Sequence, residues 1–229
     1  MSIKFKFLPL STIDYADLLS AVIFTYGCNF RCPFCHNPEL VLKSNETFLS
    51  EKQVLSEIKQ RQKLLEAVVV TGGEPLLHKD LFAFIKKLKS FGLKIKLDTN
   101  GSFPNRLNYL IQNKLIDYIA MDIKNSLEKY SITTGVNIPT NKIIKTIQII
   151  EDSGLEYEFR TTVIPGFHTK ADIANITQLF KKQSKYFIQN FVRSKHIDTS
   201  VLPNKGFSKA QLNDFINVAK QNVTNVKIQ

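Results

Sequence analysis

The sequence predicts an α/β protein whose strands form a partial, open TIM-like barrel of six βα units. Apolar runs of strand length alternate with helical periodicity along the chain, and strict alternation of this kind indicates a parallel sheet. A full barrel of eight units typically needs about 250 residues, and this chain has 229. Cysteine, glycine and polar residues follow the strands directly. Both an open barrel and the alternative architecture, a doubly wound sheet, place their chemistry there.

The first half of the chain is predicted to contain three βα units. Ser50 with Gln53 forms a capping box, which indicates a helix that begins there. The next helix has apolar residues on one face and is expected to stop at Gly92, the usual C-cap residue. A short helix is predicted after Pro104. The strands before these helices are predicted at residues 21–26, 67–71 and 93–98.

The second half is predicted to supply the other three units. A helix with isoleucines on one face follows Pro139 and ends at Gly154. Thr169 caps the next helix, with Asp172 three residues later, and the last helix begins near Ser208. The strands of this half are predicted at 117–122, at about 155–163 and at about 186–192.

No linker or low-complexity segment divides the chain, so we expect one domain over residues 1–229. Its core is expected at about 18–195, with a C-terminal helix and tail at about 205–229. No apolar run approaches the roughly 18 residues of a membrane span, and the amino terminus has no signal-peptide pattern. The net charge is +11, but the lysines are scattered and no nucleic-acid-binding signature is present. We therefore expect a cytoplasmic protein with neither a membrane nor a nucleic acid as partner.

The three cysteines of the chain lie at 28, 32 and 35, with spacing C-x3-C-x2-C. An odd count excludes a disulfide framework and indicates a reducing compartment. Thiolates of this kind select an iron–sulfur cluster, zinc or Cu(I). A zinc site that also uses His36 is the alternative, but structural zinc ligands usually come as two separated pairs. We favour a 4Fe–4S cluster, in which three cysteines leave one iron open to another ligand.

The other strand ends carry further candidates. Adjacent glycines follow the second strand and let the backbone approach a ligand closely. Asp98 and Asp122 end neighbouring predicted strands, and two nearby carboxylates need a cation or a proton between them. The complete set of candidates at these strand ends is Gly72, Gly73, Glu74, Asp98, Thr99, Asp122, Lys124, Arg160 and His196.

The chain resembles the radical S-adenosylmethionine (SAM) superfamily, in which C-x3-C-x2-C follows the first strand of a βα barrel. Within it, the chain is most similar to glycyl-radical-enzyme activases, and among these to the activating proteins of anaerobic ribonucleotide reductases. The segments that carry the resemblance cover most of the chain: CNFRCPFCHNPEL, TGGEPLL, LDTNG, MDIK and RTTVIPG. It departs at residues 16–18, Ala-Asp-Leu, where relatives often carry a Pro-Gly-Lys turn.

The resemblance implies a radical SAM fold, a 4Fe–4S cluster held by the three cysteines, and SAM bound at the open iron. One electron, supplied by reduced flavodoxin or ferredoxin, would cleave SAM into methionine and a 5′-deoxyadenosyl radical. That radical would abstract a hydrogen atom from a glycine of anaerobic ribonucleotide reductase, the protein substrate.

The resemblance also implies roles for single residues. Phe34 matches the aromatic residue beside the SAM adenosine, although plain packing explains it equally well. The segment 72–74 matches the motif that holds the SAM amino group, and a larger side chain at Gly73 is expected to block SAM while leaving the cysteine loop free. The remaining assignments are a monovalent-cation site touching the SAM carboxylate at Asp98, Thr99 and Asp122, and contacts to the SAM carboxylate, ribose or substrate backbone at Lys124 and Arg160. His196 resembles an adenine-side histidine only loosely, and we interpret it as a surface residue.

Other functions remain open at this point. The chain could activate another glycyl radical enzyme, such as pyruvate formate-lyase, or act on a small molecule, for example in modified-purine biosynthesis. A non-catalytic zinc-binding module suited to the basic charge is a further alternative. The number of functional strand ends argues against that last possibility.

Overall fold

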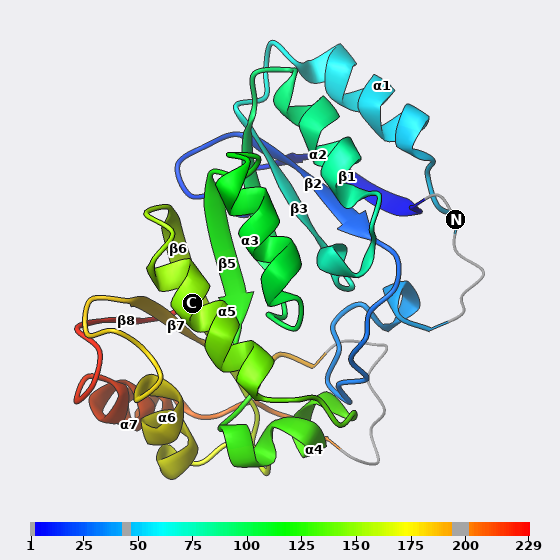
Figure 1. Cartoon of the computed structure of the whole chain (residues 1–229). Helices are drawn as coiled ribbons and strands as arrows, with labels where there is room; N and C mark the ends of the chain where they lie inside the picture. Colours follow the sequence, from blue (N-terminus) through cyan, green and yellow to red (C-terminus); the bar gives the residue numbers. More distant parts are fainter. Residues whose placement is uncertain (1–2, 43–46, 194–201) are drawn as a thin grey trace. The chain divides into compact units, whose positions relative to one another are not determined.

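The computed structural model describes residues 3–42, 47–193 and 202–229 (Figure 1). Its strands are β1 (Phe5–Ser11), β2 (Ser20–Thr25), β3 (Ala67–Gly72), β4 (Lys94–Thr99), β5 (Tyr118–Asp122), β6 (Glu156–Val163), β7 (Lys185–Asn190) and β8 (Asn225–Ile228). Its α-helices are α1 (Glu51–Arg61), α2 (Leu81–Lys89), α3 (Pro104–Gln112), α4 (Tyr130–Thr134), α5 (Asn141–Glu151), α6 (Lys170–Thr177) and α7 (Lys209–Ala219). Short 3₁₀ turns are η1 (Pro38–Leu40), η2 (Pro75–Leu77) and η3 (Leu127–Lys129).

The strands follow one another in chain order in one open sheet, β1 to β8, and β1 is antiparallel to β2. A doubly wound sheet has a point where the strand order reverses, and the order of the described strands shows none. The predicted α/β class with an open, mostly parallel sheet is therefore confirmed. The predicted strands correspond to β2 through β7, whereas β1 and β8 were not predicted.

The contacts divide the chain into two compact units, and the first comprises residues 1–29, 39–99 and 105–119. Here β2, β3 and β4 pair in parallel, with Val22 opposite Val69 and Val69 opposite Lys96. Helices α1 and α2 contact each other, α1 contacts β1, and α2 contacts β4 (Figure 1). The predicted capping box at Ser50 is present at the start of α1. Asp17 adopts the left-handed backbone that its position in the turn requires, with φ 63°, so the turn forms without glycine.

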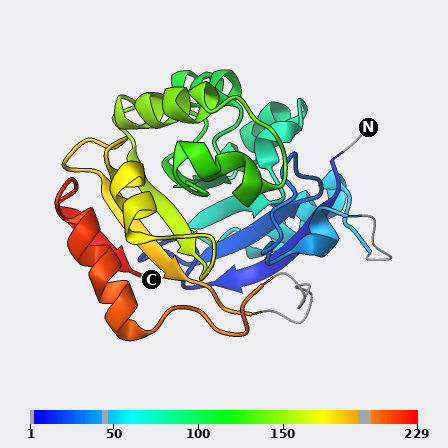
Figure 2. The same ribbon diagram turned by 90° about the horizontal axis from the view of Figure 1, so that it is seen from below.

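The second unit comprises residues 30–38, 100–104 and 120–229. Strands β6, β7 and β8 pair in parallel, and α7 packs beside α6 and against β7 and β8 (Figure 2). The predicted cap at Thr169 is present as a full capping box, and so is one at Ser208. Phe180 lies beyond the end of α6, yet its ring stacks on Phe159 at 4.4 Å between centroids. Phe180 is therefore part of the core although it lies outside the helix.

No helix of the described ranges has the length and the apolar character that crossing a membrane would require.

Candidate functional site

The chain enters the cysteine loop from β2, and its backbone is fixed just before Cys28. The Gly27 N–H donates to the Leu40 carbonyl at 2.6 Å, and the Gly27 carbonyl accepts from the Glu74 N–H at 2.8 Å. The His78 ring nitrogen Nε2 lies 2.7 Å from the carbonyl oxygen of the residue before Gly27. The turn that follows β3 therefore holds the start of the loop through its backbone and through His78.

The two glycines after β3 are required by the packing of this turn against β2. Gly72 has φ 120°, and a Cβ there would lie within 3.0 Å of Thr25 backbone atoms. A Cβ at Gly73 would lie within 3.0 Å of the Gly27 carbonyl, closer than folded proteins allow. The close approach seen here is to the chain's own backbone. The prediction that a larger residue at Gly73 leaves the cysteine loop free is therefore wrong, because its side chain would displace the residue next to Cys28.

Glu74 is fully buried and has a structural role in the first unit. Its Oε1 accepts from the Leu76 N–H at 3.0 Å and from the Thr99 hydroxyl at 2.8 Å. The carboxylate thus caps η2 and ties the end of β3 to the end of β4. The sequence places Glu74 and Thr99 in one site, and the structure joins these two side chains directly. Asp98 lies beside Thr99 on β4 and is half-buried.

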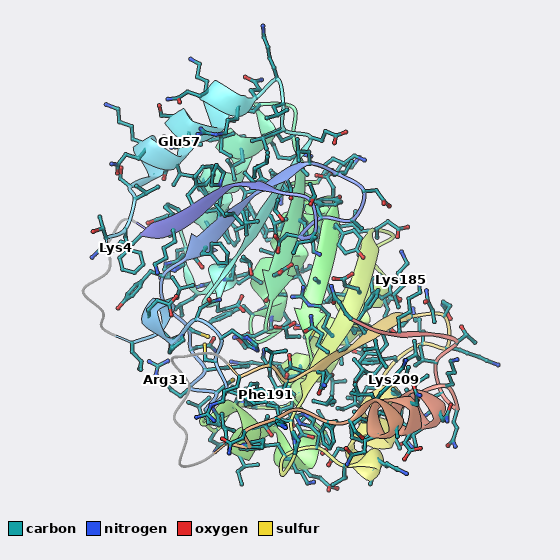
Figure 3. All side chains as sticks on the ribbon, turned by 180° about the vertical axis from the view of Figure 1, so that it is seen from behind. Lys4, Arg31, Glu57, Lys185, Phe191 and Lys209 are labelled. Atoms are coloured by element: carbon teal, nitrogen blue, oxygen red, sulfur yellow. The ribbon has the colours of Figure 1, made fainter. Side chains whose placement is uncertain are left out.

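The second part of the cysteine loop lies in the second unit and forms a tight turn, in which the Cys35 N–H donates to the Cys32 carbonyl at 3.1 Å. Phe34, which lies between these two cysteines in the sequence, is buried. Its ring meets the ring of Phe167 edge-on, at 6.1 Å between centroids. It belongs to an apolar cluster that includes Phe191, which Figure 3 labels together with Arg31. The packing interpretation of Phe34 is confirmed, and its contact with adenosine stays a prediction.

Three of the predicted site residues, Asp122, Lys124 and Arg160, form one ionic group. Asp122 is the last residue of β5, Lys124 follows it in the chain, and Arg160 lies on β6. Asp122 Oδ1 accepts from Arg160 Nε at 2.9 Å, and Asp122 Oδ2 accepts from Lys124 Nζ at 3.0 Å. Burial raises the pKa of Asp122, but Lys124 and Arg160 outweigh it and hold the pKa well below its usual range. Burial lowers the pKa of Lys124, but the charges of Asp122 and Cys32 outweigh it and raise the pKa. Lys124 therefore stays protonated near Cys32.

His168 belongs to this region and was not singled out by the sequence analysis. Its Nδ1 accepts from the Ile164 N–H at 3.1 Å, so its Nε2 carries the proton and donates to the Lys124 carbonyl at 2.9 Å. The ring must be neutral to make both bonds. The sequence gives only a weak signal for His168, because it is a single histidine, with no motif around it, that precedes the N-cap residue of α6. It links the end of β6 to the backbone of Lys124.

We expect His168 to make the stability of the protein depend on pH. Burial, its largest influence, lowers the pKa of His168 below the ordinary value of 6.5. The unfolded chain then binds a proton more readily than the folded one, so stability is full above pH 6.5 and falls as the pH drops below it.

Replacing His168 by Gln should lower the melting temperature at pH 7.5 and make its decline toward pH 5 shallower. Thermal melts across this range test it, and an unchanged slope would contradict it. Burial also lowers the pKa values of His36 and His78, so these two histidines contribute to a decline in the same direction.

The candidate residues are divided between the two units. The first contains Cys28, Gly72, Gly73, Glu74, Asp98 and Thr99, and the second contains Cys32, Phe34, Cys35, Asp122, Lys124 and Arg160. The predicted proximity of Asp98 and Asp122 therefore stays a prediction, and His196 lies outside the described residues.

The donor set itself fits an iron–sulfur cluster. The three cysteines form no disulfide and are partly exposed, and the turn at Cys32 places two of them on one short loop. Soft thiolate ligands of this kind select iron–sulfur clusters, zinc or Cu(I). In the described part of the chain, no three His, Cys, Asp or Glu side chains are gathered around one ion position.

Comparison with known proteins agrees with this chemistry. The model of the radical SAM superfamily matches residues 22–180. A protein of Methanocaldococcus jannaschii assigned as a glycyl-radical enzyme activating enzyme is 35% identical over 96% of this chain and 92% of its own length. The pyruvate formate-lyase-activating enzyme of Listeria monocytogenes is 32% identical over 80% of this chain and 73% of its own. The crystal structure of Streptococcus suis SuiB bound to S-adenosylmethionine superposes with a TM-score of 0.67 at 15% identity, over 89% of this chain and 48% of SuiB. This last likeness is one of fold, to a protein of which the chain spans about half.

Proposed function

Since the chain belongs to the radical SAM superfamily, as one of its glycyl-radical enzyme activating enzymes, we propose that it installs a glycyl radical on an anaerobic ribonucleotide reductase. Cys28, Cys32 and Cys35 would hold a 4Fe–4S cluster, with SAM at the iron that no cysteine binds. The observation that carries the proposal is the M. jannaschii relative, which matches this chain almost from end to end. The choice of reductase rests on the motifs CHNPEL, DTNG and MDIK.

The cluster and SAM, when bound, would supply one-electron cleavage of the sulfonium to methionine and a 5′-deoxyadenosyl radical. The electron would come from reduced flavodoxin or ferredoxin. The radical would take the Cα hydrogen of the target glycine, giving 5′-deoxyadenosine and a glycyl radical. Glycine suits this step because no side chain shields its Cα–H bond.

The chain's own residues would bind and orient SAM. In this proposal Lys124 and Arg160 attract the SAM carboxylate, and Phe34 packs beside the adenosine. The turn at 72–74 holds the amino group through backbone atoms. Asp122 keeps both cations in place, because its two carboxylate oxygens each accept from one of them.

A monovalent cation at Asp98, Thr99 and Asp122 stays a prediction. The Asp122 carboxylate already has Lys124 and Arg160 as compensating charges. The need for an added cation therefore rests on Asp98 and Thr99. Comparison of SAM affinity in sodium, potassium and choline buffers would test it.

We further propose that residues 1–229 act as one radical SAM domain in the cytoplasm, without a nucleic-acid or membrane partner. Three thiols that must stay reduced to bind iron support a reducing compartment.

Electron paramagnetic resonance is the test of the protein substrate. Reduced activase, SAM and an anaerobic ribonucleotide reductase from the same organism are mixed, and a doublet-type glycyl signal is expected. The signal should disappear when the target glycine of the reductase is replaced by alanine. The 31 basic residues against 20 acidic ones should speed the encounter with an acidic surface at low salt.

The Listeria relative favours a second candidate, activation of pyruvate formate-lyase. If the reductase gives no glycyl radical signal and pyruvate formate-lyase gives a strong one, the second assignment replaces the first. Methionine production without a glycyl signal on either protein would indicate a small-molecule substrate.

A further inference from the structure

The short helix α4 holds the backbone of the cysteine loop, and none of its residues belongs to the predicted SAM or cluster site. The Arg31 N–H, next to Cys32, donates to the carbonyl of Thr134 at 2.8 Å. Thr134 is the last residue of α4, so this bond satisfies a carbonyl that the helix itself leaves unpaired. Phe30, on the same loop, meets the ring of Tyr130 edge-on at 6.4 Å between centroids.

Gly135 makes this contact possible. It ends α4 in the left-handed conformation, with φ 69°. A Cβ at this position would lie within 3.0 Å of the Arg31 carbonyl oxygen and 3.2 Å from the Arg31 Cβ. The loop therefore approaches the helix end as closely as the absence of a side chain allows.

The short helix is itself anchored. Tyr130 is fully buried and accepts from the Lys124 N–H at 3.4 Å. Lys129 pairs with Asp172 at 2.7 Å, and Ser126 donates to the other oxygen of Asp172 at 2.9 Å. Burial raises the pKa of Asp172, but the hydrogen bonds from Lys129 and Thr169 outweigh it and lower the pKa to about 2. The carboxylate thus stays ionised and ties the start of α6 to the turn before α4.

We propose that the segment 127–135, which we call the loop clamp, fixes the backbone beside Cys32 for cluster binding, and that Gly135 is its critical positioning residue. The proposal rests on the cluster at the three cysteines. Groups that orient metal ligands typically change metal affinity by roughly 10- to 100-fold when mutated. The loop clamp would orient the ligand Cys32 in the same manner. It does so through the backbone of the neighbouring Arg31 and not through a hydrogen bond to the Cys32 side chain.

A matched pair of glycines provides the test. Gly154 has φ 72°, almost the same as Gly135, and no heavy atom of the described residues lies within 4 Å of a Cβ placed there. Gly135→Ala and Gly154→Ala therefore introduce the same backbone strain, and only the first collides with the cysteine loop. We expect reconstituted Gly135→Ala to lose its cluster to an iron chelator roughly tenfold faster than wild type. Its reduced cluster should also show a changed electron paramagnetic resonance line shape, whereas Gly154→Ala behaves as wild type on both counts.

The outcomes separate this inference from the proposed function. A wild-type protein that holds no iron–sulfur cluster would overturn the proposed function. A normal wild-type cluster, with equal loss rates and spectra in the two glycine variants, would overturn the loop clamp. If Gly135→Ala does not fold, as judged by circular dichroism, Phe30→Leu replaces it, because it removes the aromatic contact with Tyr130 and adds no bulk. Phe30→Leu should lose the cluster faster than Gly154→Ala, and equal rates would again overturn the clamp.

Discussion

Replacing Cys28, Cys32 or Cys35 by alanine is expected to abolish iron retention and SAM cleavage together. Each thiolate would bind a separate iron, and the chain has no other cysteine that could take the place of a lost ligand. With only two thiolates, the chain would leave more of the cluster's iron open to solvent, and the cluster would be lost. Iron and sulfide content after anaerobic reconstitution, and methionine formation with a chemical reductant, measure the two effects.

The cysteine count makes this experiment well controlled. Unfolded, unreconstituted variants should titrate two thiols against three in wild type, because the chain has three cysteines in all. The circular dichroism of each variant should match the apo wild type, since the cysteines are only partly buried. A variant that keeps full iron, or a wild type that takes up stoichiometric zinc and no iron, would contradict the cluster assignment.

The regular part of the fold could be predicted because local signals and burial agree there. The capping boxes predicted at Ser50 and Thr169 are both present in the structure. Strand β3 has the sequence AVVVTG, and the apolar run that predicts it is buried. Each of these signals lies within a few residues of sequence. The order of the strands then follows from the strict alternation of strand and helix.

The elements that were missed depend on contacts between distant residues. Strand β1 contains Pro9 and has no clean alternation, and it forms because Phe5 is buried against Phe84 at 4.6 Å between centroids. Strand β8 has only four residues. Helix α4 has five residues, several of them β-branched, and depends on the buried Tyr130 for its place.

The candidate site was predicted by residue type, but several of the reasons were incomplete. Gly73 and Glu74 were expected to serve a ligand, whereas the structure shows that each also has a role in packing or capping. Asp122 accepts from Lys124 and Arg160, two partners that the sequence analysis did not assign to it, while the predicted monovalent cation stays a prediction. Periodicity and spacing could not reveal the pairing of Asp122 with Arg160 or of Glu74 with Thr99, because each partner lies on another strand.

Gly73→Ala is expected to disturb the cluster as well as SAM binding. The new Cβ would collide with the Gly27 carbonyl and lie 3.2 Å from the backbone nitrogen of Cys28. It would also strain the bond from the Glu74 N–H to that carbonyl, which measures 2.8 Å. Overpacking of this kind typically costs about 1–3 kcal/mol. Because the collision falls beside an iron ligand, we expect lower iron retention in addition to lower stability.

Gly92→Ala is the control for this prediction in the same unit. Gly92 has φ 78°, which strains any other residue, but no described heavy atom lies within 4 Å of its added Cβ. It should therefore lose stability to strain alone and keep its iron and its spectral response to SAM. Gly73→Ala should lose both, measured by iron content and by the absorbance change on adding SAM. A Gly73→Ala protein with full iron that lacks only the response to SAM would contradict the collision at Gly27, and would mean that the glycine serves the ligand rather than the loop.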